Sequence, residues 1–358
     1  MVVPSARREG GGDVWLNGLL RHLPDVGITP LVLFEDHGEL VERATGYGCQ
    51  VVVAAKPRDA ALNAFLVTFL SCHRPQVTVF WSPRAQLLGA TAHQAAGAPG
   101  RTAWVQHVMP SDFWIHRDAS ALPADAVVCV STAVAARQRQ LYPTVPTRVV
   151  HPGVDAADAV SAETSTATLG LVGAGPLVGV VGRVEPWKGQ DVAVRMLVEL
   201  RRRGLDARLV LIGESRSRTW PEFGPLVADL AGELGVADQV SFTGAVNDVP
   251  ALLPALDVLV CASREEGFGL AALEAMAAGV PVVSTRCGGP EDLVEHEVTG
   301  LLAASEDAVG LADQVQHALA DPAATAERVR RARQRWAQSF TVRHSAEVFA
   351  EVVRGLAQ

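Results

Sequence analysis

The stretch EEGFGLAALEAMAAGVPVV, residues 265–283, carries much of the information about the fold. Its small and apolar residues 270–278 predict a helix that leads through a Gly–Val–Pro turn into a short Val-rich strand. Glu266 precedes the glycine-rich start of this helix, and Glu274 lies in its most apolar part. An isolated buried carboxylate is costly, so Glu274 needs hydrogen-bond donors. The vicinal hydroxyls of a ribose would supply them, and an ion pair with an arginine is the structural alternative.

Short β-branched runs recur between longer helical segments along the whole chain. We expect strands at 31–34, 51–53, 77–81, 102–105, 126–130 and 147–150, and then at 178–181, 208–212, 240–242, 258–261 and 280–284. Strands that alternate with helices form parallel sheets, and two such series predict an α/β protein with two doubly wound domains. A further first strand is short, because only Met1 to Val3 precede Pro4, and we expect either a truncated or a misplaced start.

Length and composition agree with this organisation. A chain of 358 residues is too long for one comfortable core, which also predicts two domains. The net charge of −8 argues against a nucleic-acid partner and against an anionic membrane surface. The 5 cysteines are odd in number and form no CxxC pair, so we expect reduced thiols, with neither a zinc site nor a disulfide framework.

Local composition indicates whether the chain carries a targeting or membrane-spanning segment, and where its two domains are joined. The first twelve residues lack the apolar core of a signal peptide, and no apolar run reaches roughly 18 residues, which predicts a cytoplasmic protein with no transmembrane segment. The segment 159–176 is rich in Ala, Ser, Thr and Gly, and we interpret it as a linker. It separates an N-terminal domain, 1–158, from a C-terminal domain, 177–339.

The stretch VVGRVEPWKGQD, residues 180–191, places two cations after a buried strand. Ligands of open α/β sheets bind at the carboxyl ends of strands, so Arg183 and Lys188 stand where a ligand would be. The chain holds only two lysines, Lys56 and Lys188, among its 31 basic residues, and a lysine in such a loop suggests a demand for a compact point charge. An exposed loop with two ordinary charges is the structural alternative.

The glycines before the 270–278 helix point to an anion. Gly267 and Gly269 let the backbone approach a ligand closely, and the first turn of the helix presents free N–H groups with a partial positive charge. If Glu266 and Glu274 were both helical, their side chains would be about 80° apart. We therefore expect Glu266 to project from the loop and Glu274 from the second turn of the helix.

These motifs resemble the family-4 retaining glycosyltransferases of the GT-B fold. The resemblance rests on EGFGLAALE (266–274), GRVEPWKGQD (182–191), LVLIGE (209–214), VSFTGAV (240–246), and VCVSTAVA (128–135) before VVHPGVD (149–155). It covers nearly the whole chain, most strongly 177–303. It implies two Rossmann-like domains that face a central cleft, with the C-terminal helix 340–358 crossing back to complete the N-terminal, acceptor-binding domain.

The resemblance also implies a role for each matching residue. Arg183 and Lys188 hold the donor's diphosphate, Glu274 binds the nucleotide ribose, and Glu266 reads hydroxyls of the transferred sugar. The implied donor-binding set is Gly11, Gly12, Arg183, Lys188, Gly244, Val246, Glu266, Gly267, Phe268, Gly269, Leu270, Ala271 and Glu274, and the implied catalytic set is His107, Arg183, Lys188 and Glu266.

Three further residues have competing interpretations. His107 matches a family histidine beside the reacting sugar, although a lone histidine after a strand is usually structural. Asp13 follows the glycine loop at a position where the family usually has Glu, and we interpret it as a helix N-cap. Arg84 follows a predicted strand and is a weaker candidate for contact with the acceptor or a phosphate.

Together these patterns predict a retaining hexosyltransferase. The donor is a UDP- or GDP-linked sugar, and the acceptor is a sugar, a lipid-linked molecule, a protein or a small natural product. The chain has no Asp-x-Asp motif, so we expect no metal and no cofactor beyond the nucleotide-sugar co-substrate. The alternatives are a nucleotide-sugar epimerase or sugar phosphorylase of the same fold, and a non-catalytic subunit that binds nucleotide sugars.

Overall fold

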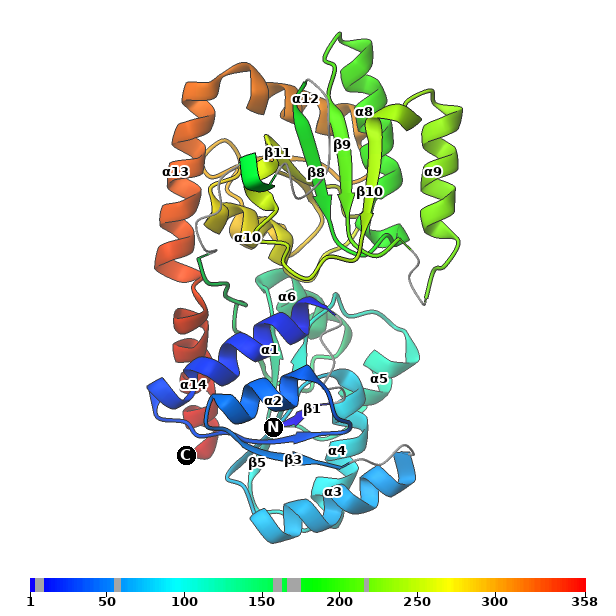
Figure 1. Ribbon diagram of the computed structural model, residues 1–358. Coiled ribbons are helices and arrows are strands. Elements are labelled where there is room, and N and C mark those ends of the chain that lie inside the picture. The colour runs from blue at the N-terminus through cyan, green and yellow to red at the C-terminus, as the bar shows by residue number, and fades with distance from the viewer. Residues whose placement is uncertain (4–9, 55–58, 157–162, 166–174, 216–218) are drawn as a thin grey trace. The chain divides into compact units, whose positions relative to one another are not determined.

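The structure, a computed structural model, describes residues 1–3, 10–54, 59–156, 163–165, 175–215 and 219–358. These residues divide into two compact units (Figure 1). Unit 1 comprises 1–153 together with 341–358, and unit 2 comprises 154–340. Most of the predicted linker, namely 159–162 and 166–174, lies outside the described residues.

Unit 1 is built on a parallel sheet of 7 strands in the order β3-β2-β1-β4-β5-β6-β7. The strands are β1 (Val2–Val3), β2 (Leu31–Phe34), β3 (Gln50–Val53), β4 (Val77–Phe80), β5 (Arg101–Gln106), β6 (Ala126–Cys129) and β7 (Thr147–Val149). The short first strand lies in the middle of the sheet and pairs with β2 and β4. The direction of winding reverses between β1 and β4, which is where open α/β sheets bind ligands.

The helices of unit 1 come from both ends of the chain. They are α1 (Gly11–His22), α2 (Glu39–Gly46), α3 (Asp59–His73), α4 (Pro83–Ala95), α5 (Trp114–Ala121), α6 (Thr132–Leu141) and α14 (Val342–Ala357). In Figure 1 the C-terminal α14 lies beside the N-terminal α1, and the two helices are in contact. Val342, Ala346 and Phe349 of α14 are buried. The predicted return of the C-terminal helix to the first domain is therefore confirmed.

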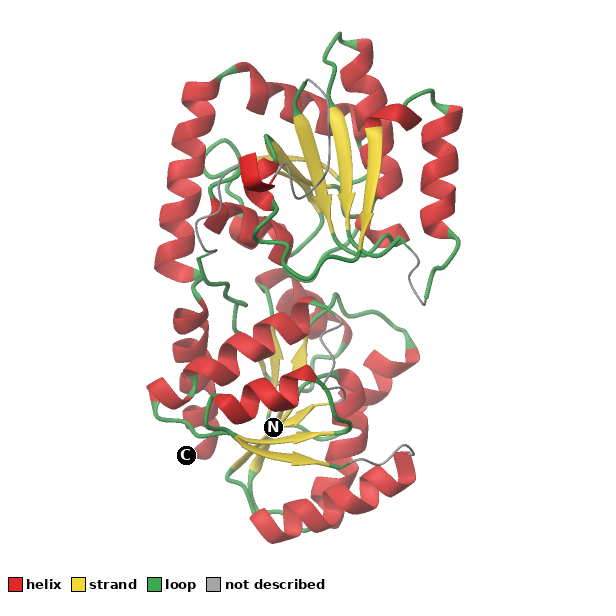
Figure 2. Cartoon of the chain, viewed as in Figure 1, coloured by secondary structure: helices red, strands yellow, loops and turns green. Residues whose placement is uncertain are grey.

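Unit 2 is built on a second parallel sheet, of 6 strands in the order β10-β9-β8-β11-β12-β13 (Figure 2). The strands are β8 (Leu177–Val181), β9 (Arg208–Ile212), β10 (Val240–Gly244), β11 (Val258–Cys261), β12 (Val282–Arg286) and β13 (Leu301–Ala304). The helices are α8 (Gln190–Arg202), α9 (Phe223–Glu233), α10 (Leu270–Ala278), α11 (Pro290–Leu293), α12 (Ala308–Ala320) and α13 (Pro322–Ser339). The winding reverses between β8 and β11.

The two sheets confirm the prediction of two doubly wound α/β domains. Every predicted strand is present within a few residues, and α10 has the predicted bounds. The strand expected at 280–284 lies at 282–286, because Val280 is still held to the end of α10 by a hydrogen bond to Ala275 O. β13 was not predicted from the sequence, because its Leu–Leu–Ala–Ala residues have none of the β-branched side chains that mark a strand.

Candidate active site

The loops that follow β8 and β11 meet at the reversal point of the unit 2 sheet. Lys188 ends a short 3₁₀ turn after β8, and Glu266 lies in the loop between β11 and α10. Lys188 Nζ lies 2.5 Å from Glu266 Oε2, and the two side chains are 25% and 20% exposed. Lys188 and Glu266 are 78 positions apart in the sequence, and the structure brings them together, as predicted for residues of one site.

The backbone around Lys188 fixes this position. Gly189 has φ = 68°, and a Cβ atom there would lie 2.0 Å from Ala262 O, so no other residue fits without moving the β11 loop. Burial lowers the pKa of Lys188, but the negative charge and hydrogen bond of Glu266 outweigh it, so that the net shift is upward. Lys188 is therefore a cation throughout the physiological pH range.

Arg183 and Glu185 form a second pair in the same loop. Arg183 Nη1 lies 3.3 Å from Glu185 Oε1; the Arg183 side chain is 50% exposed, whereas Glu185 is fully buried. Gln190 braces the turn, since its Nε2 donates to Arg183 O at 2.9 Å and its Oε1 accepts from Glu185 N at 3.4 Å. Glu185 was not predicted to be a site residue, yet its carboxylate holds the guanidinium of Arg183, the residue predicted to bind the diphosphate.

Arg264 ties the two loops together. Its guanidinium forms a bidentate pair with Asp191, at 2.9 and 2.7 Å, and also donates to Pro186 O at 2.5 Å. Its backbone N–H donates to Trp187 O at 2.8 Å. The hydrogen bonds that Arg264 donates to Asp191 raise the pKa of Arg264 despite its partial burial. No local spacing in the sequence indicates this clamp, because its partners lie more than 70 positions away.

The amino end of α10 supplies the predicted anion site. Gly269 is its N-cap at φ = 98°, and within the described chain no side-chain hydrogen bond caps this end. The first backbone N–H groups, around Leu270 and Ala271, therefore have no intrahelical partner. Gly267 and Phe268 are buried, and the loop is pinned where Glu266 N donates to Cys287 O at 3.1 Å.

Glu274 is not buried, which corrects the expectation from the sequence. It is partly exposed, on the same open face of α10 as Leu270, Ala271 and Ala278. An α10 composed mainly of Ala, Leu and Met is not buried on all sides, because a helix on a sheet keeps one stripe away from it. Glu274 has an interaction within the chain as well, so the ribose and structural interpretations both stand.

Gly244 and Val246 lie farther along the same sheet edge. Gly244 ends β10 with φ = 72°, beside a register irregularity of the β9–β10 pair. Its carbonyl accepts from Gly213 N at 3.1 Å, so this corner is held to the end of β9. Val246 follows as a partly exposed residue. Both residues therefore sit at the carboxyl edge that also carries Lys188.

In unit 1, the glycine loop and His107 come together through Trp81. His107 Nε2 lies 2.8 Å from Trp81 O, and Trp81 Nε1 donates to Gly12 O at 3.3 Å. A Cβ atom at Gly12 would lie 3.3 Å from His107 Nδ1, so this glycine permits the close approach. Because Trp81 O can only accept, His107 Nε2 carries the proton and Nδ1 keeps a lone pair. Gly11, by contrast, is exposed.

Aromatic side chains surround this histidine. The ring centroids of Trp15 and Trp81 lie 5.8 and 5.1 Å from that of His107, and Phe349 of α14 packs 6.4 Å from Trp15. Trp15 Nε1 donates to Ser345 Oγ at 2.8 Å, so α14 also holds Trp15 by a hydrogen bond. Within unit 1 the C-terminal helix therefore positions the aromatic side chains beside His107.

We expect His107 to titrate near pH 4. Burial lowers the pKa of His107 to about 4, and the hydrogen bond to Trp81 opposes this only in part. Since the unfolded chain binds this proton near its usual pKa of about 6.5, acidification from about 6.5 to 4 favours unfolding. ¹⁵N-resolved NMR titration, assigned with His107→Gln, should give a midpoint well below 5 and the Nε2–H tautomer. A midpoint near 6.5 would contradict this environment.

Two other sequence interpretations need revision. Asp13 is not the N-cap of α1; Gly10 is, and Asp13 at the third helical position accepts from Gly10 N at 3.1 Å. The helix starts earlier than expected because Gly10 is extended enough to serve as the cap. Arg84 forms ion pairs with Glu35 at 2.6 Å and with Asp59 at 2.7 Å, so its charge is already matched within unit 1.

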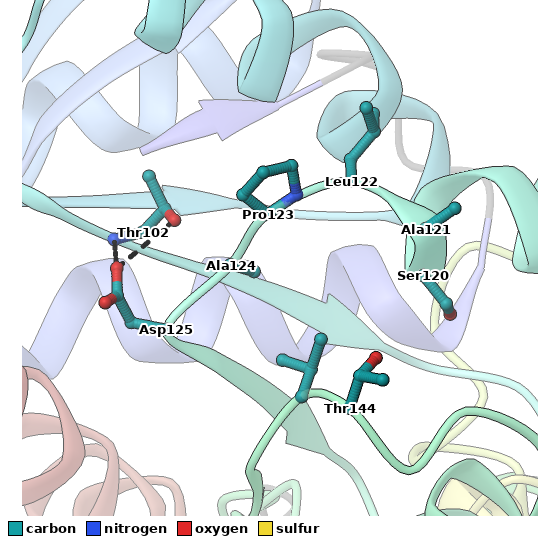
Figure 3. Close-up of a pocket in the computed structure, with 9 residues that line it drawn as sticks. Thr102, Ser120, Ala121, Leu122, Pro123, Ala124, Asp125 and Thr144 are labelled. Carbon is teal, nitrogen blue, oxygen red and sulfur yellow. Dashed lines mark hydrogen bonds between the residues drawn. The ribbon is translucent and has the colours of Figure 1, made fainter.

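A cavity of about 310 Å³ lies at the other edge of the unit 1 sheet (Figure 3). It is lined by residues that precede β6 and β7, among them Asp125 and Thr144. Asp125 Oδ2 is occupied there by Thr102 N at 2.8 Å. This cavity contains none of the predicted site residues.

Within the part of the chain that the structure describes, no helix has both the length and the hydropathy to cross a membrane. Among the same residues, no group of three or more His, Cys, Asp or Glu side chains is arranged to hold a metal ion.

Comparison with known proteins gives a family model that matches most of unit 2 and several relatives of a larger part of the chain. Residues 175–321 match the family model described as "Glycosyl transferases group 1". The D-inositol 3-phosphate glycosyltransferase of Salinispora tropica is 36% identical over 251 residues, 64% of this chain and 52% of that protein. The 2-deoxystreptamine glucosyltransferase of Streptomyces kanamyceticus is 37% identical over 177 residues, 48% of this chain and 43% of that protein. The chain spans about half the length of these curated relatives.

The fold of the whole chain also has solved counterparts. Alr3699/HepE of Anabaena in complex with UDP-glucose superimposes with a TM-score of 0.85, covering 99% of this chain and 98% of that chain at 22% identity. This likeness confirms the predicted GT-B fold.

Proposed function

Because this chain belongs to the group 1 glycosyl transferases, we propose that it transfers a hexosyl group from a nucleotide-diphosphate sugar to a hydroxyl acceptor, with retention of configuration. The Lys188–Glu266 pair carries this proposal. It supplies a cation for a phosphate and a carboxylate for sugar hydroxyls, at the edge where the unit 2 sheet reverses its winding.

We assign the donor's diphosphate to Arg183, Lys188 and the amino end of α10. Arg183 is half exposed, and Glu266 occupies only one of the three N–H donors of Lys188, so both cations retain donors for phosphate oxygens. The backbone N–H groups from Phe268 to Ala271 add the positive end of the helix dipole. Arg264 is a positioning residue here, since it holds the Lys188 turn against the α10 loop.

This placement of the diphosphate also indicates where the ribose, the base and the transferred sugar of the donor would lie. Glu274 projects from the next turn of α10 on its open face, where it can accept hydrogen bonds from the ribose. Gly244 and Val246 lie along the same edge and would meet the base through backbone groups. Glu266 reads hydroxyls of the transferred sugar. The base is uracil or guanine, and the UDP-glucose bound to the HepE relative makes UDP-glucose the first donor to test.

The proposed chemistry proceeds on one face of the sugar. The bond from C1 to the phosphate oxygen breaks as the acceptor oxygen bonds to C1 on the same face, and the acceptor's proton passes to the departing phosphate oxygen. Negative charge develops on the leaving diphosphate, and Arg183, Lys188 and the α10 amide groups stabilise it. A neutral His107 cannot donate its only ring proton, which Trp81 O already accepts, so it accepts a hydrogen bond from a substrate hydroxyl at Nδ1.

Activity should persist in excess EDTA, because fixed protein charges stand in for a divalent cation at the leaving group. The measurement is nucleotide diphosphate release after dialysis against EDTA, with and without added Mg²⁺ or Mn²⁺. Loss of activity that either ion restores would contradict this part of the mechanism.

Substitutions of Glu274 and of Glu266 should change the binding of different ligands. Glu274→Gln should weaken UDP and UDP-glucose alike, by roughly ten- to a hundredfold, since hydrogen bonds to a charged group contribute about 1.5–3 kcal/mol each. Glu266→Gln should leave UDP affinity nearly unchanged while lowering turnover and widening sugar choice.

Calorimetric titrations with UDP and UDP-glucose, together with melting curves of the variants without ligand, test both of these predictions. Glu233→Gln, which changes an exposed carboxylate of α9 in unit 2, is the control. Equal UDP affinity in wild type and Glu274→Gln, or a large loss of melting temperature in that variant without ligand, would favour the structural role for Glu274.

Product analysis distinguishes the proposal from its alternatives. The protein is incubated with UDP-glucose or GDP-mannose, alone and with a panel of hydroxyl acceptors. A glycosyltransferase forms an acceptor-dependent α-linked product and releases nucleotide diphosphate in equal amount. An isomerised sugar without acceptor indicates an epimerase, a sugar phosphate formed only with inorganic phosphate indicates a phosphorylase, and binding without any product indicates a non-catalytic subunit.

A further inference from the structure

The loop that follows β5 exposes an unusual group of apolar side chains. Val108, Phe113 and Trp114 are 52%, 59% and 51% exposed, and they are three of the six large apolar side chains that are most exposed in the described chain. The Phe113 and Trp114 rings are neighbours, with centroids 6.0 Å apart. Exposed apolar groups that gather in this way mark a binding surface more often than scattered ones do.

The exposure does not come from a loose loop. Tyr142, the C-cap of α6, donates its hydroxyl to Ser111 O at 2.7 Å, and Ser111 N donates to His116 Nδ1 at 3.1 Å. Phe113 N in turn donates to Ser111 Oγ at 3.3 Å. These bonds fix the backbone while the two aromatic rings face solvent. A platform that is already ordered binds without a further loss of conformational entropy.

Phe113 and Trp114, which we call the aromatic platform, lie at the carboxyl ends of the unit 1 strands, where a ligand is predicted to bind. The exposed apolar group that includes them begins one residue after His107, and α5 starts at Trp114 and runs back toward the start of β6, so Trp114 lies on the carboxyl side of the sheet. No hydrogen bond to His107 Nδ1 is present among the described residues, and this atom can accept one from a hydroxyl. An aromatic face, and an imidazole nitrogen at the same end of the sheet that can accept a hydrogen bond, suit a sugar-like ring.

The charges nearby exclude an anionic occupant. Arg117 is paired with Asp118 at 3.0 Å, and Asp112 adds an unmatched formal negative charge to the 107–118 segment, which contains no lysine. Arg84, the other cation considered for this edge, is already paired with two carboxylates. A phosphorylated acceptor or an anionic bilayer would therefore meet repulsion here.

We propose that Phe113 and Trp114 form the acceptor subsite, and that the acceptor presents an unphosphorylated carbohydrate or cyclitol ring whose C–H face stacks on Trp114. This inference rests on the proposed transferase function, since it names the substrate class for that reaction. Trp114 and Phe113 then determine specificity without taking part in bond making, so they act on acceptor binding rather than on the donor.

The test uses methyl β-D-glucopyranoside as the ring probe in saturation-transfer NMR, with no donor present. Sorbitol, which lacks a ring face, and glucose 6-phosphate, which carries an anion, are the matched probes. The wild-type protein should transfer more saturation to the ring protons of the glucoside than to the protons of sorbitol or of glucose 6-phosphate. Trp114→Ala should weaken its binding by roughly two- to tenfold, the effect of one lost aromatic contact. Leu226→Ala, an equally exposed apolar residue of α9 in unit 2, should leave it unchanged.

Equal glucoside signals in wild type and Trp114→Ala overturn the proposal, as does stronger binding of glucose 6-phosphate. Sedimentation with phosphatidylcholine vesicles provides a further check. Vesicle binding that Trp114→Ala abolishes, with glucoside binding unaffected, would assign the patch to a membrane and overturn the proposal too. A calorimetric UDP titration of the same preparations separates the two claims, because absent UDP binding contradicts the transferase function and not the ring subsite.

Discussion

We expect Lys188→Ala to lower kcat/KM for the donor by roughly 10²–10³-fold, the effect of removing one preorganised donor from a charge that develops in the transition state. Gly189 lets the turn close against Ala262, which places the Lys188 ammonium at the proposed diphosphate position. The variant removes that charge and leaves the surrounding backbone bonds in place.

The fold should survive this change, since Lys188 is partly exposed and Glu266 can be solvated once its partner is gone. Arg202→Ala is the matched control, because it removes an exposed cation from the far end of the helix that follows Lys188. Initial rates of nucleotide release and melting curves of both variants are the measurements. A Lys188→Ala protein that keeps most of its turnover would mean that the diphosphate binds elsewhere.

Phe349→Ala should lower the free energy of unfolding of unit 1 by about 3–5 kcal/mol, the range for removing a large aromatic side chain from a core. Phe349 is 2% exposed and packs on both Trp15 and Trp81. These two rings surround His107, so the variant should also lose turnover. Deletion of 340–358 should have a larger effect, because it exposes the face of α1 that α14 covers.

Denaturant unfolding followed by tryptophan fluorescence measures this effect, and Glu351→Ala on the exposed side of α14 is the control. Unit 2 does not contain Phe349, so its own unfolding transition should stay unchanged. If the truncated protein kept wild-type stability and turnover, α14 would have no part in unit 1.

The sequence predicted what depends on local pattern. The alternation of β-branched runs and helices gave both sheets, and the apolar residues 270–278 gave α10 with its bounds. The strand-end loops identified Arg183, Lys188 and Glu266, because parallel strands present their carboxyl ends at one edge.

What the sequence did not show depends on burial and on distant partners. Glu274 looks buried by its neighbours in sequence, but α10 leaves that face open; among the described residues the fully buried acid is Glu185, in a loop. Arg264 forms an ion pair with Asp191 at the start of α8, and Arg84 forms ion pairs with Glu35 and Asp59. None of these pairs has the three- or four-residue spacing that would reveal it in the sequence. β13 pairs with β12 although its residues favour a helix, since tertiary context overrides weak propensity.

We propose that a nucleotide diphosphate binds where the β8 and β11 loops of unit 2 meet. Amide hydrogen exchange, measured with and without saturating UDP, tests this location without any substitution. We predict that UDP slows exchange in 183–189 and 267–272, where Lys188 and the first amide groups of α10 lie, and leaves 120–125, which precede β6 at the amino ends of the unit 1 strands, unchanged. Unaltered exchange in both unit 2 segments, at a UDP concentration that calorimetry shows to be saturating, would contradict the account.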